Sequence, residues 1–172
     1  DPNALALATS SKNSIPSVRI VLLKDFNQEG FVFYTNLESQ KGNEIKDNPN
    51  ASMCFYWKSL LRQIRISGKL SKVTDQTADV YYNSRAYESR IGAWASKQSS
   101  ILKNRNELMS AIKEYKNKYN DKKNIPRPKH WSGWNLSPLS IEFWLDVENR
   151  IHERLKYIKN ENGSWDKSLL SP

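Results

Sequence analysis

Short segments rich in β-branched, aromatic and aliphatic residues follow one another along the first part of the chain, and they constrain the fold most. They predict strands over residues 5–9, 18–23, 31–35, 52–57 and 63–73. Turn-forming residues, Asn13-Ser14 with Pro16 and then residues 27–30, separate them in the manner of hairpins. This pattern has no alternation of strand and crossover helix, so we expect an antiparallel sheet.

Helical signals lie between and after these strands. Residues 39–48 are polar around Ile45 and are followed by Pro49, which predicts a short helix. Residues 74–84 begin with a threonine cap, and a later helix carries an apolar face at helical spacing. That face comprises Leu108, Ile112, Tyr115 and Tyr119, and the pair Asn104 and Glu107 before it resembles a capping box.

The last part of the chain returns to strands. Residues 121–134 are rich in Lys, Pro and Asn, which predicts a long loop. Strands are predicted over residues 139–145 and 154–158 and near Trp165. We therefore expect one α+β domain over residues 1–172, a barrel of mainly antiparallel strands with peripheral helices.

Charge and cysteine content limit the partners and the compartment. Lys plus Arg is 27 and Asp plus Glu is 18, so the net charge of +9 favours anionic partners or reflects a solvated lysine surface. Cys54 is the only cysteine, which excludes an internal disulfide and favours a reducing compartment. No apolar stretch is long enough to span a membrane, and we expect a cytoplasmic protein. Because the chain opens at Asp1-Pro2, we also expect a native N-terminal segment to be absent.

Several kinds of site are excluded by spacing. The glycines never lie within two residues of each other, so neither a G-x-G-x-x-G motif nor a Walker loop is present. A bound phosphate must therefore be held by side chains, among which arginine offers paired charge-assisted hydrogen bonds. His130, His152 and Cys54 show no paired spacing, so we expect no metal site.

Cations embedded in apolar or aromatic segments are the remaining candidates. Arg19 and Lys24 bracket an apolar run and differ by an odd number, so on a regular strand they face opposite sides. The alternative is an edge strand with solvated ends. Arg150, His152 and Arg154 fall on one face of an extended segment, where an anion or the nearby acids Glu148 and Glu153 would balance their charge.

A further cluster has helical spacing. Tyr81, Arg85 and Ser89 are separated by four residues and would share one face of a continuous helix. Their hydroxyl and guanidinium groups could together hold a phosphate.

Taken together, motifs along the whole chain resemble the pyridoxamine 5'-phosphate oxidase family. The resemblance implies an FMN-binding split β-barrel that works as a homodimer with flavin sites at the subunit interface. The motifs are Arg19-Ile20-Val21-Leu22-Leu23-Lys24, Phe33-Tyr34-Thr35-Asn36, Ile91-Gly92-Ala93-Trp94, Ser96-Lys97-Gln98-Ser99-Ser100, Ile141-Glu142-Phe143-Trp144 and Arg150-Ile151-His152-Glu153-Arg154.

The resemblance also implies roles for individual residues. The residues that it assigns to FMN are Arg19, Ile20, Val21, Leu22, Leu23, Lys24, Tyr34, Thr35, Lys41, Gln63, Gln98, Ser99, Trp144 and Arg154. Those that it assigns to the substrate are Lys24, Tyr81, Arg85, Ser89, Arg150 and His152, of which Arg150 and His152 lie over the pyridine ring as catalytic residues.

The implied reaction is oxidation of pyridoxamine or pyridoxine 5'-phosphate to pyridoxal 5'-phosphate, with O2 as acceptor and H2O2 released. Neither nucleic acid nor a membrane is an expected partner. The alternative is a split-barrel protein that binds flavin or pyridoxal phosphate without catalysis.

The chain departs from the family pattern at a few positions. Gln40 stands where the pattern has an arginine beside the lysine that corresponds to Lys41, and Leu145-Asp146 replaces Gln-Gly. Asn135 and Leu169 each replace an arginine. These departures bear on FMN affinity, whereas the predicted substrate cluster is intact.

Overall fold

The computed structural model describes all 172 residues, and the chain divides into two compact units. Unit 1 comprises Asp1–Phe33, Glu44–Ser71 and Trp134–Pro172, and unit 2 comprises Tyr34–Asn43 and Lys72–Gly133. That the whole chain is one domain stays a prediction.

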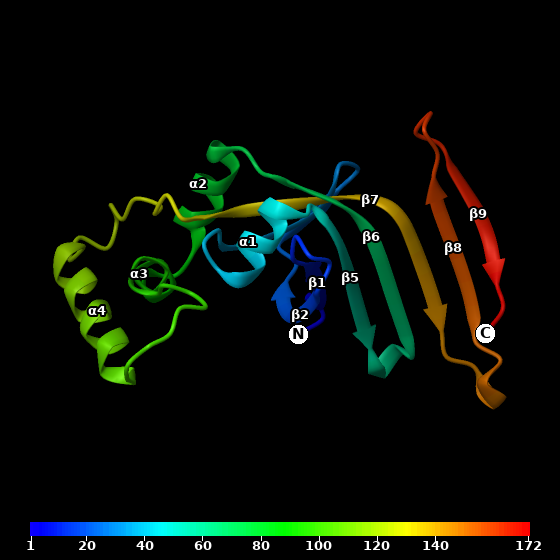
Figure 1. Ribbon diagram of the computed structural model, residues 1–172, viewed down its shortest axis with the longest axis horizontal. Helices are drawn as coiled ribbons and strands as arrows, with labels where there is room; N and C mark the ends of the chain where they lie inside the picture. The colour runs from blue at the N-terminus through cyan, green and yellow to red at the C-terminus, as the bar shows by residue number, and fades with distance from the viewer. The chain divides into compact units, whose positions relative to one another are not determined.

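The strands form a 9-stranded sheet in which every described pairing is antiparallel. Its order is β2-β1-β5-β6-β7-β4-β3, and β8 pairs with both β7 and β9. Figure 1 shows β5, β6 and β7 side by side, followed by β8 and β9 near the C-terminus. The strands are β1 (Ala4–Ser10), β2 (Pro16–Leu22), β3 (Asp25–Asn27), β4 (Gly30–Asn36), β5 (Asn50–Trp57), β6 (Arg62–Lys72), β7 (Trp131–Leu145), β8 (Glu153–Lys159) and β9 (Trp165–Leu170). The predicted α+β class with an antiparallel sheet is confirmed.

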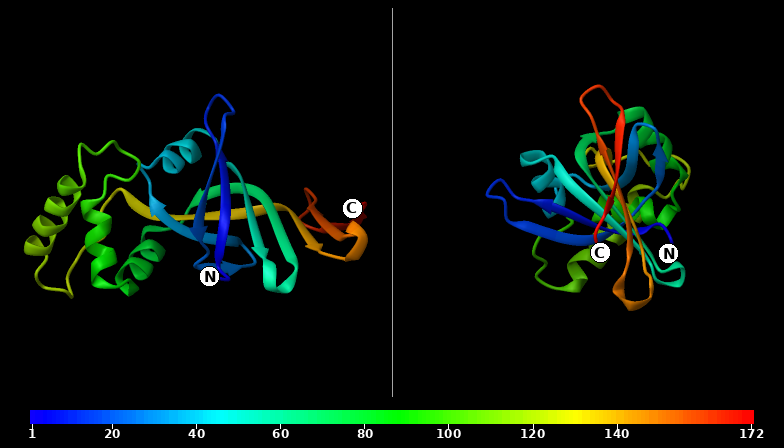
Figure 2. Two further views of the ribbon diagram at one scale, coloured as in Figure 1. Left: turned by 90° about the horizontal axis from the view of Figure 1, so that it is seen from below. Right: turned by 90° about the vertical axis from the view of Figure 1, so that its right-hand side faces the viewer.

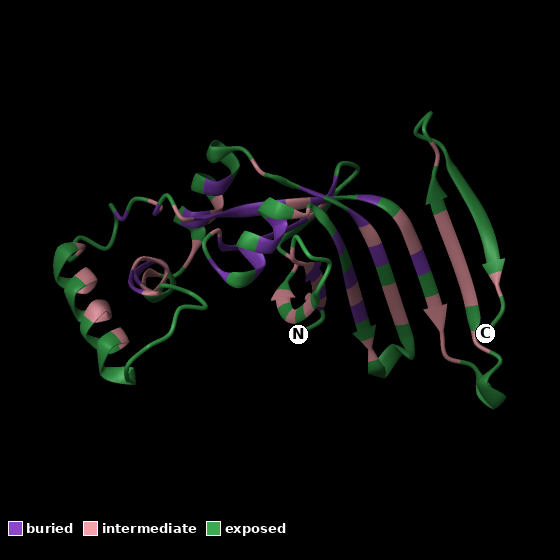
Figure 3. Ribbon diagram, viewed as in Figure 1, coloured by how far each residue is buried: buried purple, intermediate pink, exposed green.

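The core of unit 1 follows from strand alternation. Along β1, Leu5 and Leu7 are buried and their neighbours are partly exposed, as the two-residue period of a strand requires. Met53 on β5 and Ile66 on β6 are paired across the ladder and are also buried. Figure 3 shows the resulting alternation of buried and exposed bands along β5 and β6.

The helices are α1 (Gln40–Asp47), α2 (Asp75–Ser84), α3 (Tyr87–Ala95) and α4 (Arg105–Lys118), with short 3-10 turns η1 (Lys58–Leu60) and η2 (Glu148–Arg150). The predicted caps are present: Thr74 accepts from the backbone N–H of Thr77, and Asn104 accepts from that of Glu107. Glu107 reaches back to the N–H of Lys103, one residue before the cap, and so differs from the standard capping box.

Unit 2 has its own aromatic core. Tyr82, Ile91, Ile125 and Trp131 are buried together, and the predicted apolar face of α4 packs on them through Ile112, Tyr115 and Tyr119. Figure 2 shows α2, α3 and α4 from two further directions. No helix of the protein has both the length and the apolar character needed to cross a bilayer.

Two sequence-based interpretations of local structure are wrong. Tyr81, Arg85 and Ser89 do not share one continuous helix, because α2 ends at Ser84, Arg85 is its C-cap in extended conformation, and α3 begins at Tyr87. Arg150 does not belong to an extended segment, because Asn149 and Arg150 both have positive φ and β8 begins at Glu153.

Two strand boundaries also differ. The predicted loop over residues 121–134 ends early, because β7 begins at Trp131. Strand β2 ends at Leu22, so Lys24 lies beyond the regular strand on which its facing was argued.

Gly133 allows a close approach between β7 and the aromatic core of unit 2. A Cβ atom at this position would lie 2.7 Å from Cε1 of Tyr34, whose ring stacks on Tyr81 with centroids 3.9 Å apart. Gly92 on α3 is the opposite case, because a Cβ atom there would meet nothing within 4 Å.

We therefore expect Gly133→Ala to destabilise the protein by about 1–3 kcal/mol, because the Tyr34 ring must move out of its stack. Gly92→Ala is the matched control and should stabilise by about 0.5–1 kcal/mol, since alanine lowers the entropy of the unfolded chain. Urea unfolding of both variants measures the two changes. Equal effects in the two variants would contradict the close approach.

Candidate functional site

A pocket of about 350 Å³ opens within unit 2 and gathers several of the predicted site residues. Tyr34, Thr35, Arg85, Ser89 and Gln98 all line it. The other lining residues are Asn36, Gly92, Ala93, Ser96 and Trp131. Arg85 and Ser89 therefore meet at one pocket although they do not share a helix.

Arg85 is the cation of this pocket. The break between α2 and α3 directs its guanidinium over the ring of Trp131, with 4.7 Å from Cζ to the ring centroid. Its Nη1 atom is buried and has no hydrogen-bond partner. Burial lowers the pKa of Arg85 from its ordinary value, and the nearby Tyr81 and Tyr82 partly oppose this. A buried guanidinium nitrogen without a partner favours an anionic ligand.

Two aromatic residues that line the pocket, Tyr34 and Trp131, belong to a group of packed rings. Tyr34 stacks on Tyr81 at 3.9 Å and on Trp131 at 5.4 Å, and Tyr82 meets the edge of Trp131 at 5.3 Å. The buried Tyr82 hydroxyl donates to the Arg90 carbonyl oxygen at 3.0 Å. Burial raises the pKa of Tyr82 to about 12, so this hydroxyl is a fixed donor near neutral pH.

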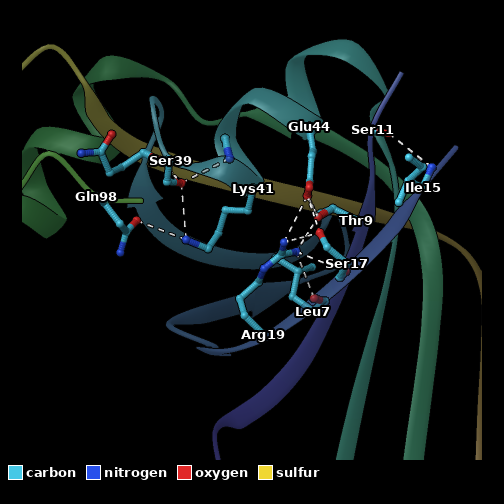
Figure 4. A network of polar contacts seen from close by, with 12 residues as sticks. Leu7, Thr9, Ser11, Ile15, Ser17, Arg19, Ser39, Lys41, Glu44 and Gln98 are labelled. Carbon is cyan, nitrogen blue, oxygen red and sulfur yellow. Dashed lines mark hydrogen bonds and ion pairs between the residues drawn. The ribbon is translucent and has the colours of Figure 1, made fainter. Parts of the chain in front are cut away.

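A second polar cluster in unit 2 surrounds Lys41, in the first turn of α1. The Nζ atom of Lys41 donates to Oε1 of Gln98 at 3.1 Å and to Oγ of Ser39 at 3.4 Å, and Lys41 is only 8% exposed (Figure 4). Thr35 donates to the same Oε1 atom at 3.3 Å. Both contacts use the amide oxygen of Gln98, which leaves its N–H groups available to a ligand. Ser99, next in sequence, is exposed with φ of 71°.

Arg19, in unit 1, has a different environment. Its Nη2 atom lies 3.1 Å from Oε2 of the buried Glu44 and 2.5 Å from Oγ of Ser17, and Nη1 donates to Thr9 (Figure 4). Thr9 and Ser17 also donate to Glu44, at 2.5 Å and 2.7 Å. The positive charge of Arg19 is therefore compensated within the protein.

The residues after Arg19 continue the alternation of β2. Ile20 and Leu22 are exposed, whereas Val21 and Leu23 are partly buried. Lys24 is exposed, and its backbone N–H donates to the Val32 carbonyl oxygen at 2.9 Å.

A larger pocket of about 710 Å³ lies within unit 1 and gathers the other predicted residues. Gln63, Trp144, His152 and Arg154 line it, with apolar side chains that include Trp57, Phe143, Leu169 and Leu170. Arg154 is held by the buried Glu142 through contacts of 2.9 Å, and it donates to the Ser171 carbonyl oxygen at 3.0 Å. Arg150 is exposed and lines neither pocket.

Several residues at these sites were not predicted. The Trp131 ring contacts the Arg85 guanidinium. Trp131 was not predicted because it is the first residue of β7 and fell within the predicted loop over residues 121–134. Glu44 and Glu142 neutralise Arg19 and Arg154, and Asp146 lies against His152. The signal for Glu142 was present in the sequence, because it is an acid within an apolar strand segment.

Two family profiles match nearly the whole chain. The profile described as pyridoxamine 5'-phosphate oxidase matches residues 1–119, and the one described as pyridoxine 5'-phosphate oxidase C-terminal dimerisation region matches residues 131–172.

Named relatives match at high identity. A pyridoxine/pyridoxamine 5'-phosphate oxidase of Pelagibacter ubique is 70% identical over 172 residues, which is 100% of this chain and 83% of that protein. The enzyme of the same name from Allorhizobium ampelinum is 53% identical over 173 residues, 100% of this chain and 84% of that protein.

Two solved structures share the fold. PhzG from Burkholderia lata 383, solved with tetrahydrophenazine-1-carboxylic acid, is similar with a TM-score of 0.93 and 31% identity over 99% of this chain and 83% of that one. A pyridoxamine 5'-phosphate oxidase-related FMN-binding protein from Nostoc punctiforme has a TM-score of 0.80 at 18% identity over 99% of this chain and 89% of that one, a likeness of fold alone.

The contacts of Glu44 with Arg19, Thr9 and Ser17 predict that removing its carboxylate destabilises the protein. Glu44→Ala should lower the free energy of unfolding by about 3 kcal/mol or more, because it leaves the largely buried Arg19 guanidinium without its carboxylate. Glu88→Ala removes an exposed pair with Lys116 and should change stability by about 0.5 kcal/mol or less. Guanidinium unfolding of both variants tests the difference. Similar losses would mean that Glu44 adds nothing beyond a surface pair.

Proposed function

The chain belongs to the pyridoxamine 5'-phosphate oxidase family, and from that premise we propose that it oxidises pyridoxamine or pyridoxine 5'-phosphate to pyridoxal 5'-phosphate. FMN is the cofactor, O2 is the acceptor and H2O2 is released. The observation that carries this proposal is the Arg85 pocket, because Arg85 lines a space of about 350 Å³ and one of its guanidinium nitrogens is buried without a hydrogen-bond partner. The alternative of a non-catalytic flavin-binding protein has no comparable observation in its favour.

Arg85 binds the substrate phosphate in this proposal. A phosphate oxygen would satisfy the orphaned Nη1 atom, and a charge-assisted hydrogen bond of this kind is stronger than a neutral one. Ser89 lines the same pocket, and Tyr81, which is not among the lining residues, stacks on the lining residue Tyr34. Lys24, Arg150 and His152 complete the proposed substrate set.

The Lys41 cluster fits FMN. A lysine that is 8% exposed and donates to Ser39 and Gln98 is held in a fixed position where it could meet a phosphate, and the free amide N–H groups of Gln98 suit the carbonyl edge of a flavin ring. Tyr34, Thr35 and Ser99 belong to the same proposed set. FMN, when bound, supplies the electron acceptor for the oxidation and the site of reaction with O2. The protein binds and orients the substrate and keeps charges balanced around it.

The strand β2 residues and the unit 1 pocket supply the remaining proposed FMN contacts. These residues are Arg19, Ile20, Val21, Leu22, Leu23 and Lys24, together with Gln63, Trp144 and Arg154. Because Glu44 and Glu142 already compensate Arg19 and Arg154, we infer that these arginines offer FMN hydrogen bonds more than net charge. The match of residues 131–172 to a dimerisation region supports a homodimer, which we propose to be cytoplasmic.

A flavin spectrum tests the function directly. The purified protein should be yellow, should bleach when pyridoxamine 5'-phosphate is added without oxygen, and should release H2O2 when air returns. A yellow protein that neither bleaches nor makes peroxide would instead be the non-catalytic alternative.

Replacing Arg85 separates substrate binding from FMN binding. Arg85→Ala should weaken substrate binding about ten- to hundredfold, because a hydrogen bond to a charged group contributes roughly 1.5–3 kcal/mol. FMN affinity should be unchanged. Arg105→Ala, at an exposed arginine at the start of α4, is the control and should alter neither. Loss of flavin with retained substrate affinity would refute the assignment.

Gln40 tests the FMN phosphate site, because it occupies the position of a family arginine beside Lys41. Gln40 is exposed at the first residue of α1, so Gln40→Arg should tighten FMN binding by about 1 kcal/mol, roughly fivefold. Added salt should reduce the gain, because an exposed pair is screened over about 10 Å at 0.1 M ionic strength. Fluorescence titration of the apoprotein at two salt concentrations measures both effects. Unchanged affinity at low salt would show that another cation already serves this phosphate.

A further inference from the structure

The side chains of Asp146 and His152 lie against each other beside the unit 1 pocket. The last pairs of the β7–β8 ladder are Trp144 with Arg154 and Leu145 with Glu153, so Asp146 and His152 are the next residues in register. The turn between them includes Asn149 and Arg150, both at positive φ, which brings the chain back without breaking that register. The contact is therefore built into the hairpin.

Both polar contacts of the His152 ring are made at the same nitrogen, Nδ1. Nδ1 lies 2.9 Å from Oδ1 of Asp146, and the backbone N–H of Val147 points to the same atom from 3.3 Å. These contacts exclude each other, because Nδ1 must carry a proton to donate to Asp146 and must lack one to accept from Val147. The shorter contact has a charged acceptor and is the stronger, so it favours a protonated Nδ1.

The other ring nitrogen is left for a ligand. Nε2 of His152 has no hydrogen-bond partner, and the His152 side chain is 21% exposed where it lines the pocket. The ring also packs against Trp144, with centroids 4.7 Å apart. With Nδ1 bonded to a carboxylate and the ring in tilted contact with an indole, His152 has little freedom to turn.

We propose that Asp146 is a positioning residue that holds His152 with Nδ1 protonated, so that Nε2 accepts a hydrogen bond from the substrate. The carboxylate side chain is a feature of this chain, since the family pattern has glycine at this position. The state of the imidazole follows from the hairpin alone. The link to the substrate rests on the function proposed above.

The tautomer can be measured without activity, because the chain has only 2 histidines. In protein labelled with ¹⁵N-histidine, long-range ¹H–¹⁵N correlation spectra distinguish the two neutral forms of each ring at alkaline pH. His130 is an internal reference of the opposite kind, because its Nε2 atom lies 2.8 Å from the Ala93 carbonyl oxygen and must donate. His130→Gln assigns the signals.

We expect His152 to carry its proton on Nδ1 in the unaltered protein. In Asp146→Ala it should change to the Nε2-protonated form, with the Val147 N–H donating to Nδ1, while His130 stays the same. Glu148→Ala removes a nearby exposed acid of η2 and should change neither ring. An Nε2-protonated His152 in the unaltered protein, or no change in Asp146→Ala, would overturn the proposal.

Kinetics of the FMN-loaded protein test the link to the substrate. Asp146→Ala should lower kcat/KM about tenfold, in line with the loss of a partner that orients a functional histidine. Asp146→Asn should restore most of it, because the amide oxygen still accepts from Nδ1–H. A changed tautomer with unaltered kcat/KM would overturn the catalytic link. A protein whose tautomer depends on Asp146 but which never oxidises the substrate would overturn the proposed function instead.

Discussion

The arrangement of side chains in this protein depends on buried carboxylates that neutralise partly buried arginines. The chain carries a net charge of +9, yet several of its cations lie within apolar strands or among aromatic rings, where an isolated charge is costly. Glu44 pairs with Arg19, and Glu142 pairs with Arg154 and, more weakly, with Arg65. These carboxylates are buried and hydrogen-bonded, so the arginines act as parts of the scaffold of unit 1.

Arg85 is the contrasting case. It lies on the Trp131 ring without a carboxylate partner, and one of its nitrogens has no hydrogen bond. An arginine that is already paired with a carboxylate helps to hold the folded structure together. An arginine with an N–H group that has no acceptor can instead bind an anion. This difference in partners, rather than the number of cations, distinguishes the scaffold from the proposed substrate site. Asp146 extends the same logic to His152, where a carboxylate fixes which nitrogen carries the proton.

The sequence predicted the elements better than their boundaries. Alternation around Leu5 and Met53 marked strands, and Thr74 and Asn104 were correctly identified as helix caps, because these patterns depend on neighbours close in the chain. The helix predicted over residues 74–84 ends where α2 ends, but the spacing of Tyr81, Arg85 and Ser89 also fits one continuous helix, so it could not show that a separate helix begins at Tyr87. The positive φ of Arg150 was missed because arginine carries no turn signal.

The α+β class, the family and the candidates for phosphate binding could all be predicted from the sequence, since these predictions depend on local periodicity and on motifs at fixed spacing. Which of those cations are already paired becomes visible only in the folded protein. Glu44 lies 25 residues from Arg19, and Trp131 is far from Arg85 in sequence, so no local pattern connects them. Charge pairing depends on distance in space and on burial, and both are fixed only when strands and helices distant in the chain pack together.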